Sequence, residues 1–297
     1  MTGARGALAR QANRFRPGRA RMLKTRVITA AALLAVLLAA LAVSENLLLA
    51  VLAVGFGAVV WEWLRIARIE MTFVWMIAGI ETAVMCAAAF LDVRPGGELF
   101  IGFELIVTCV WLAVLAVVFA ARDRGFGLKR SYSIVMALTF PLAAWAALLW
   151  FAREGGWPLM LSVFMVVWLA DVFAYFSGLA FGRHKMAVAI SPKKTWEGAL
   201  GAVVTVLFVT VVAYVMLPVK CVFTSRLVAV HGFGTAFVMI FLLVALSIAG
   251  DLFESALKRQ AGIKDSSNLL PGHGGFFDRL DAALAVFPAA AVALLVL

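Results

Sequence analysis

The sequence predicts an all-α fold, in which about nine transmembrane helices form a polytopic integral membrane bundle. Composition is the first reason: hydrophobic residues make up 65% of the 297 positions and charged residues 14%, which leaves too little polar surface to cover a water-soluble globule. The second is that apolar runs of about 18 residues recur along the chain, each long enough to cross hydrocarbon as a helix. The third is that Lys and Arg gather in alternate loops. No sheet is expected.

Residues 1–26 form a basic segment with few large apolar residues, a composition typical of a disordered tail on the cytoplasmic membrane surface. Its basic residues are Arg5, Arg10, Arg14, Arg16, Arg19, Arg21, Lys24 and Arg26. With the following apolar run and Ala40-Leu41-Ala42, this segment also resembles a cleaved signal peptide. The basic region and the apolar run are both long for such a peptide, so we expect the first span to be retained.

Nine apolar runs follow the tail and predict the transmembrane helices. They cover residues 27–43, 46–63, 71–91, 99–121, 132–151, 158–181, 198–217, 232–250 and 282–297. We divide the chain into amino-terminal helices over 27–152 and a carboxyl-terminal region over 153–297, which we expect to be catalytic because it holds the dense polar motifs.

Basic residues in the connecting loops predict the orientation. Loops after even-numbered spans hold Arg65, Arg68, Arg122, Arg124, Lys129, Arg130, Arg183, Lys185, Lys193, Lys194, Lys258, Arg259, Lys264 and Arg279. Loops after odd-numbered spans hold only Arg94, Arg153, Lys220 and Arg226. Since basic loops stay in the cytoplasm, the amino terminus is predicted to be cytoplasmic and the carboxyl terminus outside, in the inner plasma membrane. The net charge of +10 then reflects topology and anionic lipid headgroups and does not indicate nucleic acid.

The loop between the eighth and ninth spans carries the densest polar motif. Residues spaced i, i+3, i+4 and i+7 would share one face of a helix that continues out of the eighth span: Asp251, Glu254, Ser255 and Lys258. Asp278 and Asp281 share a face at the start of the ninth span in the same way. Both groups of residues lie on the predicted cytoplasmic side, where nucleoside triphosphates are available.

Helix-breaking residues separate these two groups, and their exposed backbone N–H groups predict an anion cradle: Pro271, Gly272, Gly274 and Gly275. Carboxylates beside basic residues suit Mg²⁺ with bound phosphates, which indicates phosphoryl transfer; the basic residues are Lys258, Arg259, Lys264 and Arg279. The alternative is positive-inside charge with carboxylates as ion-pair partners, but acidic residues at a lipid-embedded helix end are costly without a function. With no second His or Cys nearby, His273 is expected to bind phosphate or donate a hydrogen bond rather than ligate metal.

A second polar motif surrounds the loop after the sixth span. Asp171, Tyr175, Gly178 and Gly182 form a polar and small-residue stripe, and Ser191, Lys193, Lys194 and Thr195 precede an expected helix start. The free N–H groups of that helix start would add to phosphate binding by the two lysines. A structural role, as a helix cap with positive-inside charge, is the alternative for this loop.

Other polar residues within the spans have no role that the sequence identifies. Glu81 and Glu104 are candidates for inter-helix contacts or for a cavity. Trp61 and Trp63 are expected to anchor the second span at the membrane interface.

The stretch from Ser255 to Asp281 resembles the signature of the phosphatidate cytidylyltransferases, also called CDP-diacylglycerol synthases. It contains Ser, Lys-Arg, Lys-Asp, His-Gly-Gly and Asp-Arg-x-Asp in matching order and spacing, without departure. The earlier run Ser191-Pro-Lys-Lys-Thr-Trp-Glu-Gly is similar to a recurring loop of that family. The resemblance covers roughly the last 130 residues.

The resemblance implies transfer of a cytidylyl group from CTP to phosphatidic acid, giving CDP-diacylglycerol and pyrophosphate in phospholipid biosynthesis. It implies an Mg²⁺ requirement, Asp251 and Asp278 as the metal-binding pair, and a second, monovalent cation such as K⁺. Catalytic roles fall to these two residues with Lys258, Lys264 and Asp281. Substrate binding falls to Ser191, Lys193, Lys194, Thr195, Ser255, Arg259, His273, Gly274, Gly275 and Arg279. The oligomeric state stays open, with a homodimer among the candidates.

Three other functions compete with this one. A CDP-alcohol phosphotransferase would carry an Asp-Gly-x-x-Ala-Arg motif, which the sequence lacks. A transporter for an anionic solute would suit Asp171, Glu81 and Glu104, but no inverted repeat is visible and the charges gather at one membrane face. An inactive relative kept as a scaffold would be expected to have lost motif residues, and none is missing.

Overall fold

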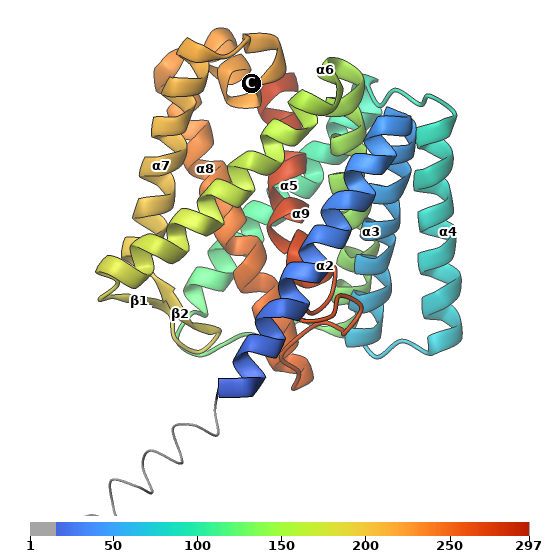
Figure 1. Ribbon diagram of the computed structural model, residues 1–297, viewed down its shortest axis with the longest axis vertical. Helices are drawn as coiled ribbons and strands as arrows, with labels where there is room; N and C mark the ends of the chain where they lie inside the picture. Colours follow the sequence, from blue (N-terminus) through green and yellow to red (C-terminus); the bar gives the residue numbers. More distant parts are fainter. Residues whose placement is uncertain (1–15, 297) are drawn as a thin grey trace, which may run out of the picture.

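The computed structural model describes residues 16–296, and its helices follow the predicted apolar runs (Figure 1). The helices are α2 (Arg16–Val43), α3 (Glu45–Ile66), α4 (Met71–Phe90), α5 (Gly97–Ala120), α6 (Arg130–Phe181), α7 (Trp196–Met216), the 3₁₀ turn η1 (Val219–Cys221), α8 (Phe223–Ala261) and α9 (Phe277–Leu295). The described part of the predicted tail is helical, because α2 begins at Arg16; Arg5, Arg10 and Arg14 lie outside the described residues. The all-α membrane class is confirmed.

Seven helices of the described chain, α2 to α8, are long and apolar enough to cross a membrane. The fifth and sixth predicted spans both lie within α6, which bends at Gly156, where φ is 70° and Pro158 follows. A positive φ favours glycine, and proline removes a backbone donor, so this sequence interrupts the helix without ending it. The expected division between residues 152 and 153 falls inside α6, close to this bend.

The prediction of no sheet was wrong in one short segment. Strands β1 (Lys185–Ala187) and β2 (Ser191–Thr195) form an antiparallel hairpin in which Lys185 pairs with Thr195 and Ala187 with Ser191. Met186 and Ala187 of β1 and Ile190 of the turn are buried. Pro192 and two adjacent lysines disfavour a helix, and the hairpin is too short to give a periodic hydrophobic pattern.

Helix α9 forms the centre of the bundle, with α3, α5, α6 and α8 packed around it (Figure 1). Its residues from Ala282 to Ala293 are buried, and most of them are small. Close packing is clearest where α8 meets the start of α9: a Cβ added at Gly250 would lie 2.6 Å from the backbone oxygen of Asp281. Small residues allow helix backbones to approach in this way, and here the approach brings two acidic residues together.

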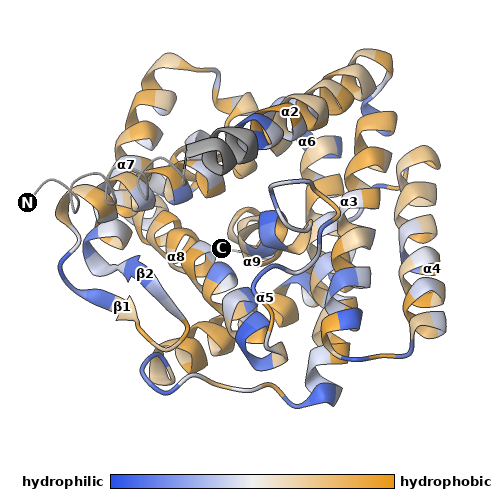
Figure 2. Cartoon of the chain, turned by 60° about the horizontal axis from the view of Figure 1, so that its bottom comes forward, coloured by the Kyte–Doolittle hydropathy of each residue, from blue (hydrophilic) through white to orange (hydrophobic). Residues whose placement is uncertain are grey.

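The expected interface anchor Trp63 is instead a core residue with no exposed surface. Its ring stacks on Phe277 with centroids 4.8 Å apart, and its indole N–H donates to Ser133 Oγ at 3.0 Å. The indole therefore finds a polar partner inside the bundle rather than at the membrane surface. Hydrophilic residues gather at the end of the molecule that holds the hairpin and the loop before α9 (Figure 2).

Candidate functional site

Helix α8 continues beyond its apolar part, as predicted, and presents one polar face. Ser255 Oγ donates to Asp251 Oδ1 at 3.3 Å, and Lys258 Nζ lies 2.5 Å from Glu254 Oε2. The opposite face is buried through Leu252, Phe253, Ala256 and Leu257, which is why the helix persists to Ala261. Gly262, with φ of 74°, then ends it in the left-handed conformation that glycine favours.

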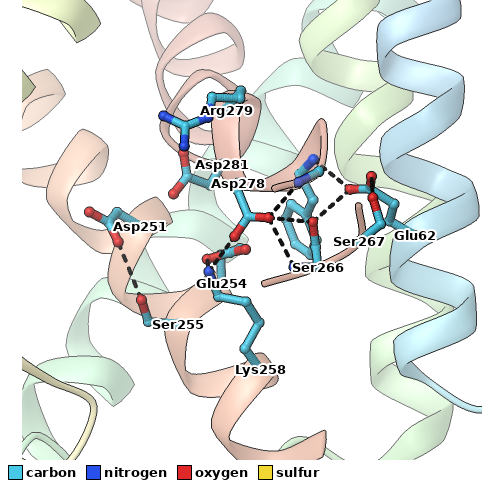
Figure 3. A network of polar contacts seen from close by, with 12 residues as sticks. Glu62, Asp251, Glu254, Ser255, Lys258, Ser266, Ser267, Asp278, Arg279 and Asp281 are labelled. Atoms are coloured by element: carbon cyan, nitrogen blue, oxygen red, sulfur yellow. Dashed lines mark hydrogen bonds and ion pairs between the residues drawn. The ribbon is translucent and has the colours of Figure 1, made fainter. Parts of the chain in front are cut away.

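The start of α9 places its two aspartates, Asp278 and Asp281, in different environments (Figure 3). Asp278 accepts hydrogen bonds from Ser266 N at 2.9 Å, Gly275 N at 2.8 Å and Lys258 Nζ at 2.6 Å. Ser266 Oγ also lies 2.7 Å from Asp278 Oδ2, but its single proton is shared with Glu62. Asp281 instead faces α8, where carboxylate oxygens of Asp251, Glu254 and Asp281 lie within 4.8 Å of one another. Lys258 bridges Glu254 and Asp278 and thus connects the two environments.

The three carboxylates Asp251, Glu254 and Asp281 could hold a divalent cation, and we call them the acidic trio. Glu254 is buried, and its Oε1 has no hydrogen-bond partner among the described residues. An unpartnered oxygen in a cluster of hard ligands fits Mg²⁺. Of the predicted metal pair, Asp251 belongs to this trio, whereas Asp278 is outside it and already accepts from Ser266 N, Gly275 N and Lys258 Nζ.

The hairpin joins the second predicted motif to the first. Lys194 Nζ lies 2.5 Å from Asp251 Oδ2, so the two motifs form one site. Burial alone would lower the pKa of the Lys194 ammonium, but the Asp251 and Asp171 carboxylates outweigh it and hold that pKa above its usual value. Lys194 therefore stays charged at neutral pH.

A cavity of about 490 Å³ adjoins this ion pair. Its walls come from α6, the hairpin, α7 and α8, and include Asp171, Tyr175, Ser191, Lys193 and Asp251. The stripe predicted from Asp171 to Gly178 therefore lines the cavity. One wall is acidic and another is basic, an arrangement suited to a ligand that carries both phosphates and a cation.

Thr195 precedes α7, at the helix start that we expected, and is its N-cap: its Oγ1 accepts from Gly198 N at 3.2 Å, which is the structural role that we gave as the alternative. Its side chain packs against Gly178 and Gly182, where an added Cβ would lie 3.0 Å from Thr195 atoms. The stripe of small residues on α6 thus lets the hairpin and the start of α7 approach closely.

In the loop over residues 262–276, one of the backbone N–H groups that we expected to bind phosphate, that of Gly275, instead donates to a carboxylate of the protein. Gly275 N–H donates to Asp278, and Phe276 and Phe277 N–H donate to Glu62. Of the expected cradle, Gly275 therefore has an internal anion as its partner. A Cβ at Gly274 would lie 2.7 Å from Asp278 Oδ2, so glycine is required for this approach.

Of the other predicted residues in and beside this loop, His273 is half-buried, with its Nδ1 buried and without a partner among the described residues. The His273 carbonyl accepts from Arg279 at 2.8 Å; burial, with Arg279 and Arg26 nearby, lowers the pKa of the His273 imidazole. Arg259 and Lys264 are exposed, and their side chains have no ion pair with a described residue. They remain free to bind a ligand from solution.

Sequence analysis missed Glu62 and Arg65 on α3. Glu62 has no exposed surface and contacts Ser266 and Ser267, more than 200 positions away in the chain. Arg65 donates to Ser266 O at 2.6 Å and lies over the Trp61 ring. The sequence feature that could have identified Glu62 is its position as an acidic residue inside an apolar span, between two tryptophans. Glu104 is also fully buried, but both its oxygens lack a partner among the described residues, and it has no contact with the site.

Comparison with known proteins gives the family. A family model described as cytidylyltransferase family matches residues 24–297. The phosphatidate cytidylyltransferase of Pseudomonas aeruginosa is 38% identical over 277 residues, which cover 90% of this chain and 95% of that protein. The enzyme of the same name from Haemophilus influenzae is 34% identical over 285 residues, covering 90% and 96%. The chain therefore belongs to the cytidylyltransferase family, with phosphatidate cytidylyltransferases as full-length relatives, as its carboxyl-terminal motifs indicated.

Proposed function

We propose that the protein transfers the cytidylyl group of CTP to phosphatidic acid and releases CDP-diacylglycerol and pyrophosphate. One observation carries the proposal: the Lys194 to Asp251 ion pair joins two motifs into a single phosphate- and cation-binding site beside a cavity, in a membrane protein. The names of the full-length relatives support the same substrates. The activity is that of a nucleotidyltransferase in phospholipid biosynthesis.

Mg²⁺ is part of the proposal, because the acidic trio offers three oxygen ligands and an unpartnered Glu254 oxygen. Asp251, Glu254 and Asp281 are the residues that we propose to hold it, with Asp278 fixed beside them by Lys258. When bound, Mg²⁺ supplies charge neutralisation for the triphosphate and for the departing pyrophosphate. A second, monovalent cation such as K⁺ is supported by the family resemblance alone.

The reaction needs positioning more than acid–base chemistry. An anionic oxygen of the lipid phosphate attacks the α-phosphorus of CTP, a new P–O bond forms, and the bond from the α-phosphorus to the bridging oxygen of pyrophosphate breaks. Because the nucleophile is already ionised, no strong general base is required. Lys193 and Lys194 from the hairpin, with Lys258, Arg259, Lys264 and Arg279, hold the phosphates and balance their charge.

The lipid substrate enters from the membrane in this proposal. Tyr175 lines the cavity and is 65% exposed on the outer side of α6, which supports a lateral opening toward lipid. We further propose that the chain crosses the inner membrane nine times, with α6 contributing two crossings and α9 one. The amino terminus and the site then face the cytoplasm and the carboxyl terminus lies outside, because the loops at the site's end hold most of the basic residues.

Pyrophosphate release by the purified protein in detergent tests the proposal directly. We expect release only when CTP, phosphatidic acid and Mg²⁺ are all present, and loss of release with EDTA. Mass spectrometry of the lipid product should detect CDP-diacylglycerol in the same reaction. Pyrophosphate release without phosphatidic acid would indicate hydrolysis of CTP, and no release under any condition would reject the transferase function.

A further inference from the structure

Glu62 is a buried carboxylate whose every acceptor position is used. Oε1 accepts from Ser267 Oγ at 2.5 Å and Phe276 N at 3.0 Å, and Oε2 accepts from Ser266 Oγ at 2.8 Å and Phe277 N at 2.7 Å. No cation among the described residues forms an ion pair with it. A buried carboxylate without a cation is tolerated only where hydrogen bonds replace its hydration; here the donors are two backbone N–H groups, the Ser267 hydroxyl and the Ser266 hydroxyl, whose proton is shared with Asp278.

Two of these hydrogen bonds cap α9 from another helix. Phe276 is the N-cap of α9, and its own side chain makes no capping hydrogen bond. The first backbone N–H groups of a helix have no partner within it, and a negative charge near them is favourable. Glu62 of α3 therefore takes the place of a local Ser, Thr or Asp cap, and it does so for the helix that carries Asp278 in its first turn and Asp281 just after it.

The other two hydrogen bonds connect Glu62 to the loop that holds Asp278. Ser266 Oγ lies between Glu62 Oε2 and Asp278 Oδ2, at 2.8 and 2.7 Å (Figure 3). Arg65, one turn further along α3, donates a hydrogen bond to the backbone carbonyl of the same serine. A Cβ on Gly275 would overlap both Glu62 oxygens and Ser266 Oγ. A change at Glu62 therefore reaches Asp278 through one hydroxyl group.

We propose that Glu62 is a positioning residue for the transfer reaction, which caps α9 and fixes the loop over 262–276 so that the α9 aspartates meet α8. The inference rests on the proposed function for its kinetic consequence, but its structural consequence is independent of substrates. Glu62 does not touch the acidic trio in this arrangement; it acts through Ser266 and the start of α9.

Glu62→Gln is the informative substitution. Gln keeps the shape but replaces one oxygen by an NH₂ group, which faces the N–H of Phe276 or of Phe277 whichever way the amide is turned. Glu70→Gln is the matched control, because Glu70 is exposed at the same end of the bundle and caps nothing with its side chain. We expect kcat of Glu62→Gln to fall about 10- to 100-fold with little change in the KM for CTP, and Glu70→Gln to match the wild type.

Hydrogen exchange measured by mass spectrometry separates positioning from general stability. In Glu62→Gln, backbone amides of residues 262–278 should exchange faster, while those in the buried part of α8 keep wild-type rates. If Glu62→Gln does not fold, Ser267→Ala removes one of the four hydrogen bonds without changing charge, and it should speed exchange in the same loop and lower kcat. An active wild type with unchanged kcat and unchanged loop exchange in the folded variant would overturn the inference. An inactive wild type would instead reject the transferase function, and the exchange measurement would still decide the role of Glu62.

Discussion

Replacing Asp278 by Asn tests the site with the smallest change in shape. The carboxylate accepts two backbone N–H groups on Oδ2, where it also shares the Ser266 hydroxyl proton with Glu62, and the Lys258 ammonium on Oδ1. With its oxygen toward the loop, Asn keeps the three loop donors but points its NH₂ group at Lys258. In the other orientation NH₂ faces two backbone donors that cannot accept. The first orientation costs one charge-assisted hydrogen bond, about 1.5–3 kcal/mol, and is the cheaper of the two.

A loss of this size leaves the protein folded, because a typical protein is stable by about 5–15 kcal/mol. Activity should suffer far more, since Lys258 loses the partner that holds it between α8 and α9. We expect turnover to fall about 100-fold or more while the variant elutes as a single folded species in detergent. Pyrophosphate release at saturating CTP, with thermal unfolding measured on the same sample, is the assay.

Asp123→Asn is the matched control, because it is the same substitution at an exposed position outside both motifs. It should retain wild-type turnover and stability. Wild-type turnover by a folded Asp278→Asn protein would remove Asp278 from the site. Loss of folding would show that the carboxylate contributes more to stability than its hydrogen bonds predict.

Three further substitutions test other parts of the site. Lys194→Ala removes the ion pair with α8 and should raise the KM for CTP or phosphatidic acid more than it lowers expression; unchanged KM values would leave Lys194 a structural role only. Gly275→Ala places a methyl group against the Glu62 carboxylate and should lower the free energy of unfolding by about 1–3 kcal/mol and abolish most of the turnover. The control Gly79→Ala has open space around the added methyl group and should leave both thermal unfolding and turnover unchanged. Arg26→Ala combined with Thr29→Val breaks two hydrogen bonds from α2 to the loop carbonyls and should lower kcat several-fold, and equal kcat would show that α2 does not support the loop.

Local sequence patterns predicted those parts of the site that one helix determines. The polar face of α8 follows from spacing alone, because residues at i, i+3, i+4 and i+7 must share a face. The cap at Thr195 follows equally from local chemistry. The two α9 aspartates have the same spacing, yet Asp281 joins Asp251 while Asp278 joins the loop. That difference depends on how close α8 and α9 approach at Gly250, which no local pattern encodes.

The missed features have their partners far away in the chain. Glu62 resembles an isolated acid in an apolar span until Ser266, Ser267 and the start of α9 are placed around it. The anion cradle was predicted from its glycines, but its occupant was not, because the sequence does not tell whether a backbone N–H group meets an external phosphate or an internal carboxylate. The Lys194 to Asp251 ion pair likewise requires the packing of α6, α7 and α8.

The cap that α3 provides for α9 has a consequence for how the protein is made. Helix α3 is synthesised and inserted long before α9, so during most of translation Glu62 has none of its four donors. A carboxylate at the edge of hydrocarbon is costly without partners, which favours keeping that end of α3 hydrated until the last helix arrives. The final helix then completes both the hydrogen bonding of α3 and the acidic trio. A ribosome that stalls before α9 would therefore leave an incompletely assembled membrane protein with an exposed charge, a feature that quality-control proteases can recognise.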